Sequence, residues 1–189
     1  MNRIAALLLT LVLTACSKGE ARPGVTDVSG TSPDLRFTLQ RASDGREVTA
    51  ADYRGKVVIL YFGYTNCPDV CPATLANLTD ALAKLGPHAN AVQILFVTVD
   101  PDRDTLDKLK QYAAAFDPHV DGLRGNANTL MRLARRYRVA YEVQTSPKYE
   151  VMHSESVFFF DPEAHARLVE LSTNDSGAVA RDIARLMHS

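Results

Sequence analysis

Residues 57–72 read VVILYFGYTNCPDVCP and join an apolar run to a pair of cysteines. Most of the first six residues are β-branched or aromatic, which is typical of a strand buried on both faces of a sheet. After a loop, leucines spaced three and four apart predict a helix over 73–85 that ends at a Gly-Pro pair. Pro72 fits the first helical turn, where its missing N–H costs nothing. The pattern predicts a central strand, a loop carrying Cys67 and Cys71, and a helix.

Apolar periodicity predicts further elements on both sides of this unit. We expect a hairpin of 35–39 with 47–49, a strand at 92–99, helices at 104–116 and 126–137, a strand at 139–143, a polar loop through 148, a hairpin of 156–160 with 166–172, and a helix at 176–187. This order predicts an α/β protein with a thioredoxin-like fold and an added N-terminal β-hairpin. On the 126–137 helix, Arg132, Arg135 and Arg136 are interpreted as a solvated face.

The N-terminus carries a targeting signal. Arg3 precedes the apolar run 4–13, which is too short to span a bilayer. The sequence LTAC at 13–16 resembles the lipobox of bacterial lipoproteins, in which cleavage leaves an N-terminal cysteine that is diacylated on sulfur. We therefore expect residues 1–15 to be a lipoprotein signal peptide and Cys16 to be the lipidated residue. An ordinary signal peptide with an incidental cysteine is the alternative.

Composition predicts one domain behind a tether. Segment 16–33 is rich in Gly, Ser, Thr and Pro, so after the lipidated cysteine we expect a flexible tether, with the folded domain at 34–189. A chain of 189 residues with 46% hydrophobic residues can bury a single core. Lysine and arginine (21) nearly balance aspartate and glutamate (22), so we expect no nucleic-acid partner.

Cysteine usage limits the chemistry of the chain. With Cys16 assigned to lipid, Cys67 and Cys71 remain, four positions apart. In an oxidising compartment such a pair forms a disulfide, a metal site, or both in turn. Thiolates at the start of a helix are stabilised by its positive end, which lowers their pKa. Two soft thiolates suit Cu(I), and an added imidazole gives a site that also accepts Cu(II).

Three motifs in this order closely resemble those of the Sco/SenC family, the copper chaperones and thiol oxidoreductases that assist the Cu(A) site of cytochrome c oxidase. They are CPDVCP at 67–72, VTVDP at 97–101 followed by RDT at 103–105, and the His-Ser pair at 153–154 before a buried strand. The match spans most of 33–188. Any one of the motifs alone would be weak, whereas the three together are specific.

The resemblance implies a copper site and a client. Cys67, Cys71 and His153 would bind copper as Cu(I) or Cu(II), and the two cysteines would form a disulfide when oxidised. The implied partners are the cytochrome c oxidase subunit that carries Cu(A) and other copper chaperones. The implied location is the periplasmic side of the bacterial envelope, on the inner membrane, with the outer membrane as the alternative. Met152 departs from the family, whose members usually carry an acidic residue at this position.

Two functions from different classes remain open. A metallochaperone would pass copper to the client by ligand exchange. A thiol–disulfide oxidoreductase, with Cys67 and Cys71 as catalytic residues, would instead reduce the client's cysteines or serve redox signalling. Three residues separate the cysteines where thioredoxins have two, and Glu155 precedes the strand where thioredoxins have a proline. Both features favour the metallochaperone, although copper binding itself requires the reduced dithiol.

Overall fold

The computed structural model describes residues 22–147 and 149–189. Its strands are β1 (Val25–Asp27), β2 (Thr38–Arg41), β3 (Glu47–Thr49), β4 (Val57–Gly63), β5 (Val92–Thr98), β6 (Val120–Arg124), β7 (Tyr141–Gln144), β8 (Glu150–His153), β9 (Val157–Phe160) and β10 (Ala166–Glu170). Its α-helices are α1 (Val70–Leu85), α2 (Leu106–Ala114), α3 (Ala127–Arg136) and α4 (Ser176–Leu186), with 3-10 helices at Ala50–Tyr53 and Gly86–Ala91. Eight strands form a sheet in the order β1-β10-β9-β4-β5-β6-β2-β3, and β7 pairs with β8 in a separate sheet.

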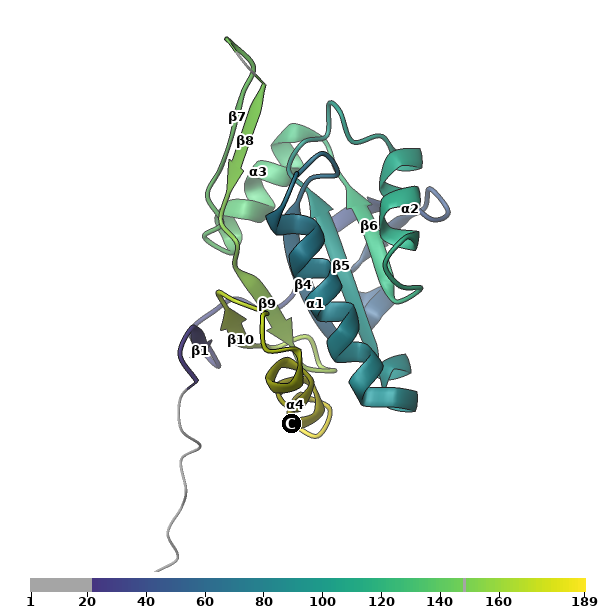
Figure 1. Cartoon of the computed structure of the whole chain (residues 1–189), viewed down its shortest axis with the longest axis vertical. Coiled ribbons are helices and arrows are strands. Elements are labelled where there is room, and N and C mark those ends of the chain that lie inside the picture. Colours follow the sequence, from purple (N-terminus) through teal and green to yellow (C-terminus); the bar gives the residue numbers. More distant parts are fainter. Residues whose placement is uncertain (1–21, 148) are drawn as a thin grey trace, which may run out of the picture.

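Helices cover both faces of the eight-stranded sheet. Figure 1 shows α1 and α4 in front of it and α3 behind it. Parallel strands β4 and β5 lie at the centre, and all seven residues of each are buried. The two buried strands predicted from the sequence are therefore confirmed, since continuous apolar runs suit strands that water reaches on neither face.

Both predicted hairpins are present. Strand β2 pairs antiparallel with β3 and also with β6, which joins the N-terminal hairpin to the edge of the main sheet. Strand β9 pairs antiparallel with β10 and β4, and α4 follows. The arrangement is the expected thioredoxin-like fold with an added N-terminal β-hairpin.

Three short strands escaped the sequence analysis, namely β1, β6 and β8. Strand β6 has the sequence VDGLR, which lacks a continuous apolar run. A Cβ on its Gly122 would lie 3.0 Å from the backbone oxygen of Leu109, so the glycine allows α2 to approach the strand closely. Strand β8, sequence EVMH, alternates between exposed and half-buried residues because it pairs with β7 outside the main sheet.

The prediction of a flexible tether is wrong for residues 22–33. Within this segment β1 adds an edge strand beside β10. Arg22 lies 2.7 Å from Glu170 of β10 and 2.6 Å from Asp182 of α4, and both carboxylates are almost fully buried. Burial raises the pKa of Glu170, while Arg22 opposes that shift. A buried carboxylate needs a compensating charge, and this requirement holds the start of the segment on the domain.

The expected signal peptide and Cys16 lie outside the described residues. Among the residues that the structure does describe, no helix is long and apolar enough to cross a membrane.

Candidate metal centre

The two cysteines lie where β4 gives way to α1. The helix begins at Val70, three residues earlier than predicted, so that Cys71 falls in its first turn and Cys67 in the preceding loop. Asp69 occupies the N-cap position but its side chain does not cap the helix. Instead, the backbone N–H of Cys71 donates to the sulfur of Cys67 at 3.3 Å. A sulfur atom thus takes the place of the oxygen that usually satisfies a free N–H at a helix start.

Gly63 allows the buried sulfur to approach the end of β4. A Cβ at this position would lie 2.5 Å from the ring of Phe96 and 3.1 Å from Sγ of Cys71. Real Cβ atoms do not tolerate the shorter contact, and both neighbours are packed in the core. The residue before the loop must therefore be a glycine for Cys71 to occupy its place.

A buried carboxylate braces the loop between β4 and α1. Asp104 accepts hydrogen bonds from the backbone N–H of Thr65 at 3.0 Å and from the Thr65 hydroxyl at 2.5 Å. It also accepts one from the hydroxyl of Thr98 at 2.6 Å. Asp104 is fully buried, and these three contacts compensate for its burial. The loop that presents Cys67 is consequently tied to the end of β5.

The two thiols have different acidities. Burial disfavours the thiolate of Cys67, but backbone N–H groups of Cys71 and Asp69 and the side chains of Cys71 and Tyr64 stabilise it, and the pKa of Cys67 is lowered. Burial, together with the hydrogen bond to Cys67, raises the pKa of Cys71 to about 12. Cys67 is half-buried and Cys71 has no exposed surface. Cys67 is therefore the accessible and more readily ionised thiol of the pair.

His153 reaches the cysteines from the end of the β7–β8 hairpin. Its Nε2 lies 3.3 Å from Sγ of Cys71. Its Nδ1 lies 2.9 Å from the carbonyl oxygen of Ser154, so a proton on Nδ1 is donated there and the lone pair of Nε2 points to the sulfur. The ring of Tyr64 meets the imidazole edge to face, with 5.9 Å between ring centroids.

A second contact fixes the hairpin to the main sheet. The hydroxyl of Tyr149 donates to the buried carboxylate of Asp100 at 2.6 Å. Arg103 donates to the other oxygen of Asp100 at 2.5 Å, and its guanidinium lies 3.7 Å from the centre of the Tyr149 ring. We call these three residues the hairpin latch. The sequence predicts a polar loop through residue 148 and carries no local signal for Tyr149. The charged run at 100–104, directly after a buried strand, is the signal that points to this contact.

The structure brings together the three residues that the resemblance singled out. The ligand atoms of Cys67, Cys71 and His153 all lie within 4.8 Å of one another. Among the described residues this is the one group of three or more possible ligands. Both cysteines are free thiols here, so their predicted disulfide stays a prediction. A cavity of about 310 Å³ opens beside Cys67 and His153 and is also lined by Met152, which is 58% exposed.

Comparison with known proteins gives a consistent result. The SCO1/SenC family profile matches residues 29–188. The mitochondrial SCO2 homologue of Bos taurus is 40% identical over 124 residues, which are 63% of this chain and 47% of the relative. The chain thus spans about half the length of this curated relative.

Solved structures share the fold. The crystal structure of Arabidopsis thaliana ScoI with copper bound has a TM-score of 0.74 and 32% identity, covering 82% of this chain and 98% of that one. A SCO1/SenC family lipoprotein from Bacillus anthracis has a TM-score of 0.69 and 25% identity, covering 81% and 94%. The predicted thioredoxin-like fold is confirmed, and the fold is one that holds copper in a relative.

Proposed function

The chain belongs to the SCO1/SenC family, and on this premise we propose that it binds copper through Cys67, Cys71 and His153 and carries it as cargo in the cell envelope. The observation that carries the proposal is the cluster of two sulfur atoms and one imidazole nitrogen within 4.8 Å. Two of these residues lie in the β4–α1 segment and the third lies 82 positions beyond Cys71. Thiolates and an imidazole are ligand types that suit copper, and here they lie close enough to share one ion.

The donor set matches copper in both oxidation states. Soft thiolates favour Cu(I), and the imidazole supports Cu(II). The pKa of Cys67 is lowered, whereas burial raises the pKa of Cys71 while its sulfur contacts only protein groups. A bound metal ion deprotonates a coordinating thiol outright, so copper binding releases protons from this site. The relative from Arabidopsis thaliana holds copper on the same fold.

The client follows from the family resemblance. We propose that the protein delivers copper to the cytochrome c oxidase subunit that carries Cu(A), together with other copper chaperones. Cys16 would anchor the chain by its lipid to the periplasmic side of the membrane, and the Bacillus anthracis relative is itself a lipoprotein. The cavity beside Cys67 and His153 offers the client's ligands a direct approach to the metal.

A second function, thiol–disulfide exchange, is favoured by the unequal thiols. A half-buried cysteine with a lowered pKa beside a buried one with a raised pKa is the arrangement of an attacking and a resolving thiol. In that function Cys67 would attack a client disulfide and Cys71 would then displace the client as the Cys67–Cys71 disulfide forms. The two functions are compatible, because reduced cysteines are needed for both.

Copper titration of the reduced full-length protein tests the proposal. We expect a single copper per chain, with X-ray absorption showing sulfur and nitrogen donors. The matched control is the Cys67→Ser, Cys71→Ser double variant, which preserves side-chain size and removes both thiolates. Oxidised wild-type protein should bind copper far more weakly, since disulfide sulfur is a poor ligand. Equal copper content in the wild type and the double variant would sink the proposal.

A further inference from the structure

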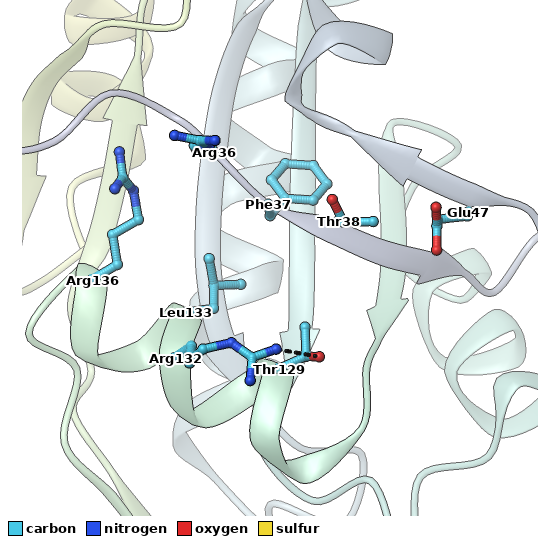
Figure 2. A pocket seen from close by; sticks show the side chains of 8 residues that line it. All are labelled: Arg36, Phe37, Thr38, Glu47, Thr129, Arg132, Leu133 and Arg136. Carbon is cyan, nitrogen blue, oxygen red and sulfur yellow. Dashed lines mark hydrogen bonds between the residues drawn. The ribbon is translucent and has the colours of Figure 1, made fainter.

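A groove lies between α3 and the N-terminal hairpin, and α3 covers the face of the sheet opposite α1 (Figures 1 and 2). Its volume is about 390 Å³, larger than the cavity of about 310 Å³ beside Cys67. We call it the arginine groove, and its lining residues are Arg36, Phe37, Thr38, Glu47, Thr129, Arg132, Leu133 and Arg136. It shares no lining residue with the cavity at the cysteines.

Three arginines line this groove, and the guanidinium of one of them, Arg136, lies 5.9 Å from the centre of the Tyr137 ring. Within the described part of the chain, no carboxylate forms an ion pair with Arg36, Arg132 or Arg136. Arg132 donates instead to the hydroxyl of Thr129 at 3.3 Å, and Arg136 donates to the backbone oxygen of Asp34 at 3.0 Å. These two hydrogen bonds leave further guanidinium N–H groups of both arginines available. A guanidinium can bind a carboxylate with two parallel hydrogen bonds.

The arginines are brought together by the fold and held there. Arg36 lies 96 positions before Arg132 in the sequence. The hydroxyl of Tyr137 accepts a hydrogen bond from the backbone N–H of Arg36 at 3.0 Å and donates one to the backbone oxygen of Asp34 at 3.1 Å. These bonds fix the segment that leads into β2 against the end of α3. Positive charge therefore gathers at one end of the groove, whereas the whole chain has a net charge of −1.

The groove has an apolar floor and is elongated. Phe37 and Leu133 line it with nearly buried side chains, at 7% and 6% exposed. A neighbouring cavity of about 350 Å³ shares Thr38, Glu47 and Thr129 with it, so the hollow continues along β2. Figure 2 shows Arg36 and Arg136 toward one end and Glu47 toward the other. A single small anion would leave most of this length empty.

We propose that the arginine groove binds an extended acidic segment of a partner protein. Its carboxylates would pair with the three arginines, and an apolar side chain would rest on Phe37 and Leu133. The sequence pattern suggested only a solvated basic face on α3, but the structure divides that face. Arg132 and Arg136 line the groove, whereas Arg135 does not. The charge of Arg135 acts instead on Tyr141 of β7, where it opposes the burial that raises the pKa of this tyrosine.

A recessed floor and a carboxylate at one end distinguish this groove from a membrane-binding patch. An anionic bilayer is broad and would meet exposed basic side chains without reaching the floor. Glu47 would also repel its headgroups. A peptide segment can enter the hollow and place its acidic end away from Glu47, which gives the bound segment a direction.

Fluorescence anisotropy of the full-length protein in neutral detergent tests the proposal. The probe is a labelled ten-residue peptide with four glutamates, two leucines and serine elsewhere, compared with the same peptide carrying glutamine for glutamate. We expect the acidic peptide to bind and the glutamine peptide not to bind. Arg132→Gln should weaken binding roughly tenfold, as expected for one lost charge-assisted contact. Arg36→Gln should act similarly, and binding should weaken as salt is raised.

Arg135→Gln is the matched control, because it removes the same charge from the same helix outside the groove. We expect less than about a twofold change in affinity from it, since long-range attraction by one exposed charge is largely screened. Equal effects of Arg132→Gln and Arg135→Gln would overturn the proposal, as would equal binding of the two peptides. Displacement of the peptide by phosphatidylglycerol in mixed micelles of the same detergent, but not by phosphatidylcholine in such micelles, would also overturn it and assign the groove to the membrane surface.

Discussion

The two halves of the proposed copper site are built in different ways. Cys67 and Cys71 follow β4 at the centre of the main sheet, with Cys71 fully buried and the loop braced by the buried Asp104. His153 instead ends a two-stranded hairpin whose residues alternate between exposed and half-buried. Packing holds the cysteines, whereas a few hydrogen bonds and the hairpin latch hold the histidine. Segments with few buried apolar contacts open at a low free-energy cost. We therefore expect His153 to move more easily than the two cysteines.

This contrast bears on the proposed transfer of copper to a client. A metal that must leave needs a ligand that can be exchanged without disturbing the core. His153 lines the open cavity with Met152, and its hairpin can move away while both sulfur atoms remain in place. The imidazole half is therefore where we expect exchange with a client to begin.

The largest effect should come from His153→Ala, which removes the adjustable ligand. Loss of a residue that only hydrogen-bonds to a metal ligand lowers metal affinity roughly 10- to 100-fold. Loss of the ligand itself should lower the Cu(II) affinity by more than that. Cu(I), held by two thiolates, should be weakened less. The thiolate-to-Cu(II) absorption band measures the loss, and exchange with a small disulfide should remain largely intact. An unchanged Cu(II) spectrum would show that His153 is a packing residue.

A change in the cysteine half should act through the fold itself. Gly63→Ala places a methyl group against Phe96 and the sulfur of Cys71, so the native state should lose roughly 1–3 kcal/mol from overpacking. Urea denaturation measures the loss. Gly177→Ala in α4 is the control, where the nearest contact would be 3.3 Å to a flexible carboxylate and stability should change by less than about 1 kcal/mol. Equal stabilities of the two variants would contradict the close packing at Cys71.

Loosening the hairpin latch should have a moderate effect. Tyr149→Phe removes the donor to the buried Asp100, a hydrogen bond that contributes about 1 kcal/mol, so Cu(II) affinity should fall roughly fivefold. Amide hydrogens of β7 and β8 should also exchange faster in the metal-free protein. Tyr141→Phe removes a hydroxyl from the same hairpin and should change neither quantity. Wild-type exchange rates in Tyr149→Phe would show that other contacts hold the hairpin.

The smallest effect concerns the two thiols within the cysteine half. Because the pKa of Cys67 is lowered and that of Cys71 is raised to about 12, iodoacetamide should modify Cys67 first at about neutral pH. Its rate should level off at a lower pH than for an ordinary cysteine, while that of Cys71 keeps rising. Peptide mass spectrometry identifies the modified residue. Preferential labelling of Cys71 would reverse the assignment of attacking and resolving thiol.

Elements with strong local signals were predicted well. Strands β4 and β5 are long apolar runs, and the helices carry leucines at helical spacing or are capped by Thr105, Asn126 and Asp175. The missed strands are three to five residues long and depend on their neighbours for stability. The segment 22–33 was misjudged because its composition is that of a linker, while its order comes from two buried carboxylates far along the chain.

The sequence by itself determined that a buried strand leads into a helix through a loop with two cysteines, because that signal is local. It could tie His153 to those cysteines only through the family motifs, since nothing in local periodicity spans 82 residues. The tertiary structure alone decided that Nε2 of His153 lies against Sγ of Cys71 and that Tyr149 and Asp100 hold the hairpin in place. It also decided that Arg36 lies in one groove with the arginines of α3. Each is a contact between segments that are distant in the sequence. Such contacts form only when folding of the sheet brings these segments together, so no local sequence pattern predicts them.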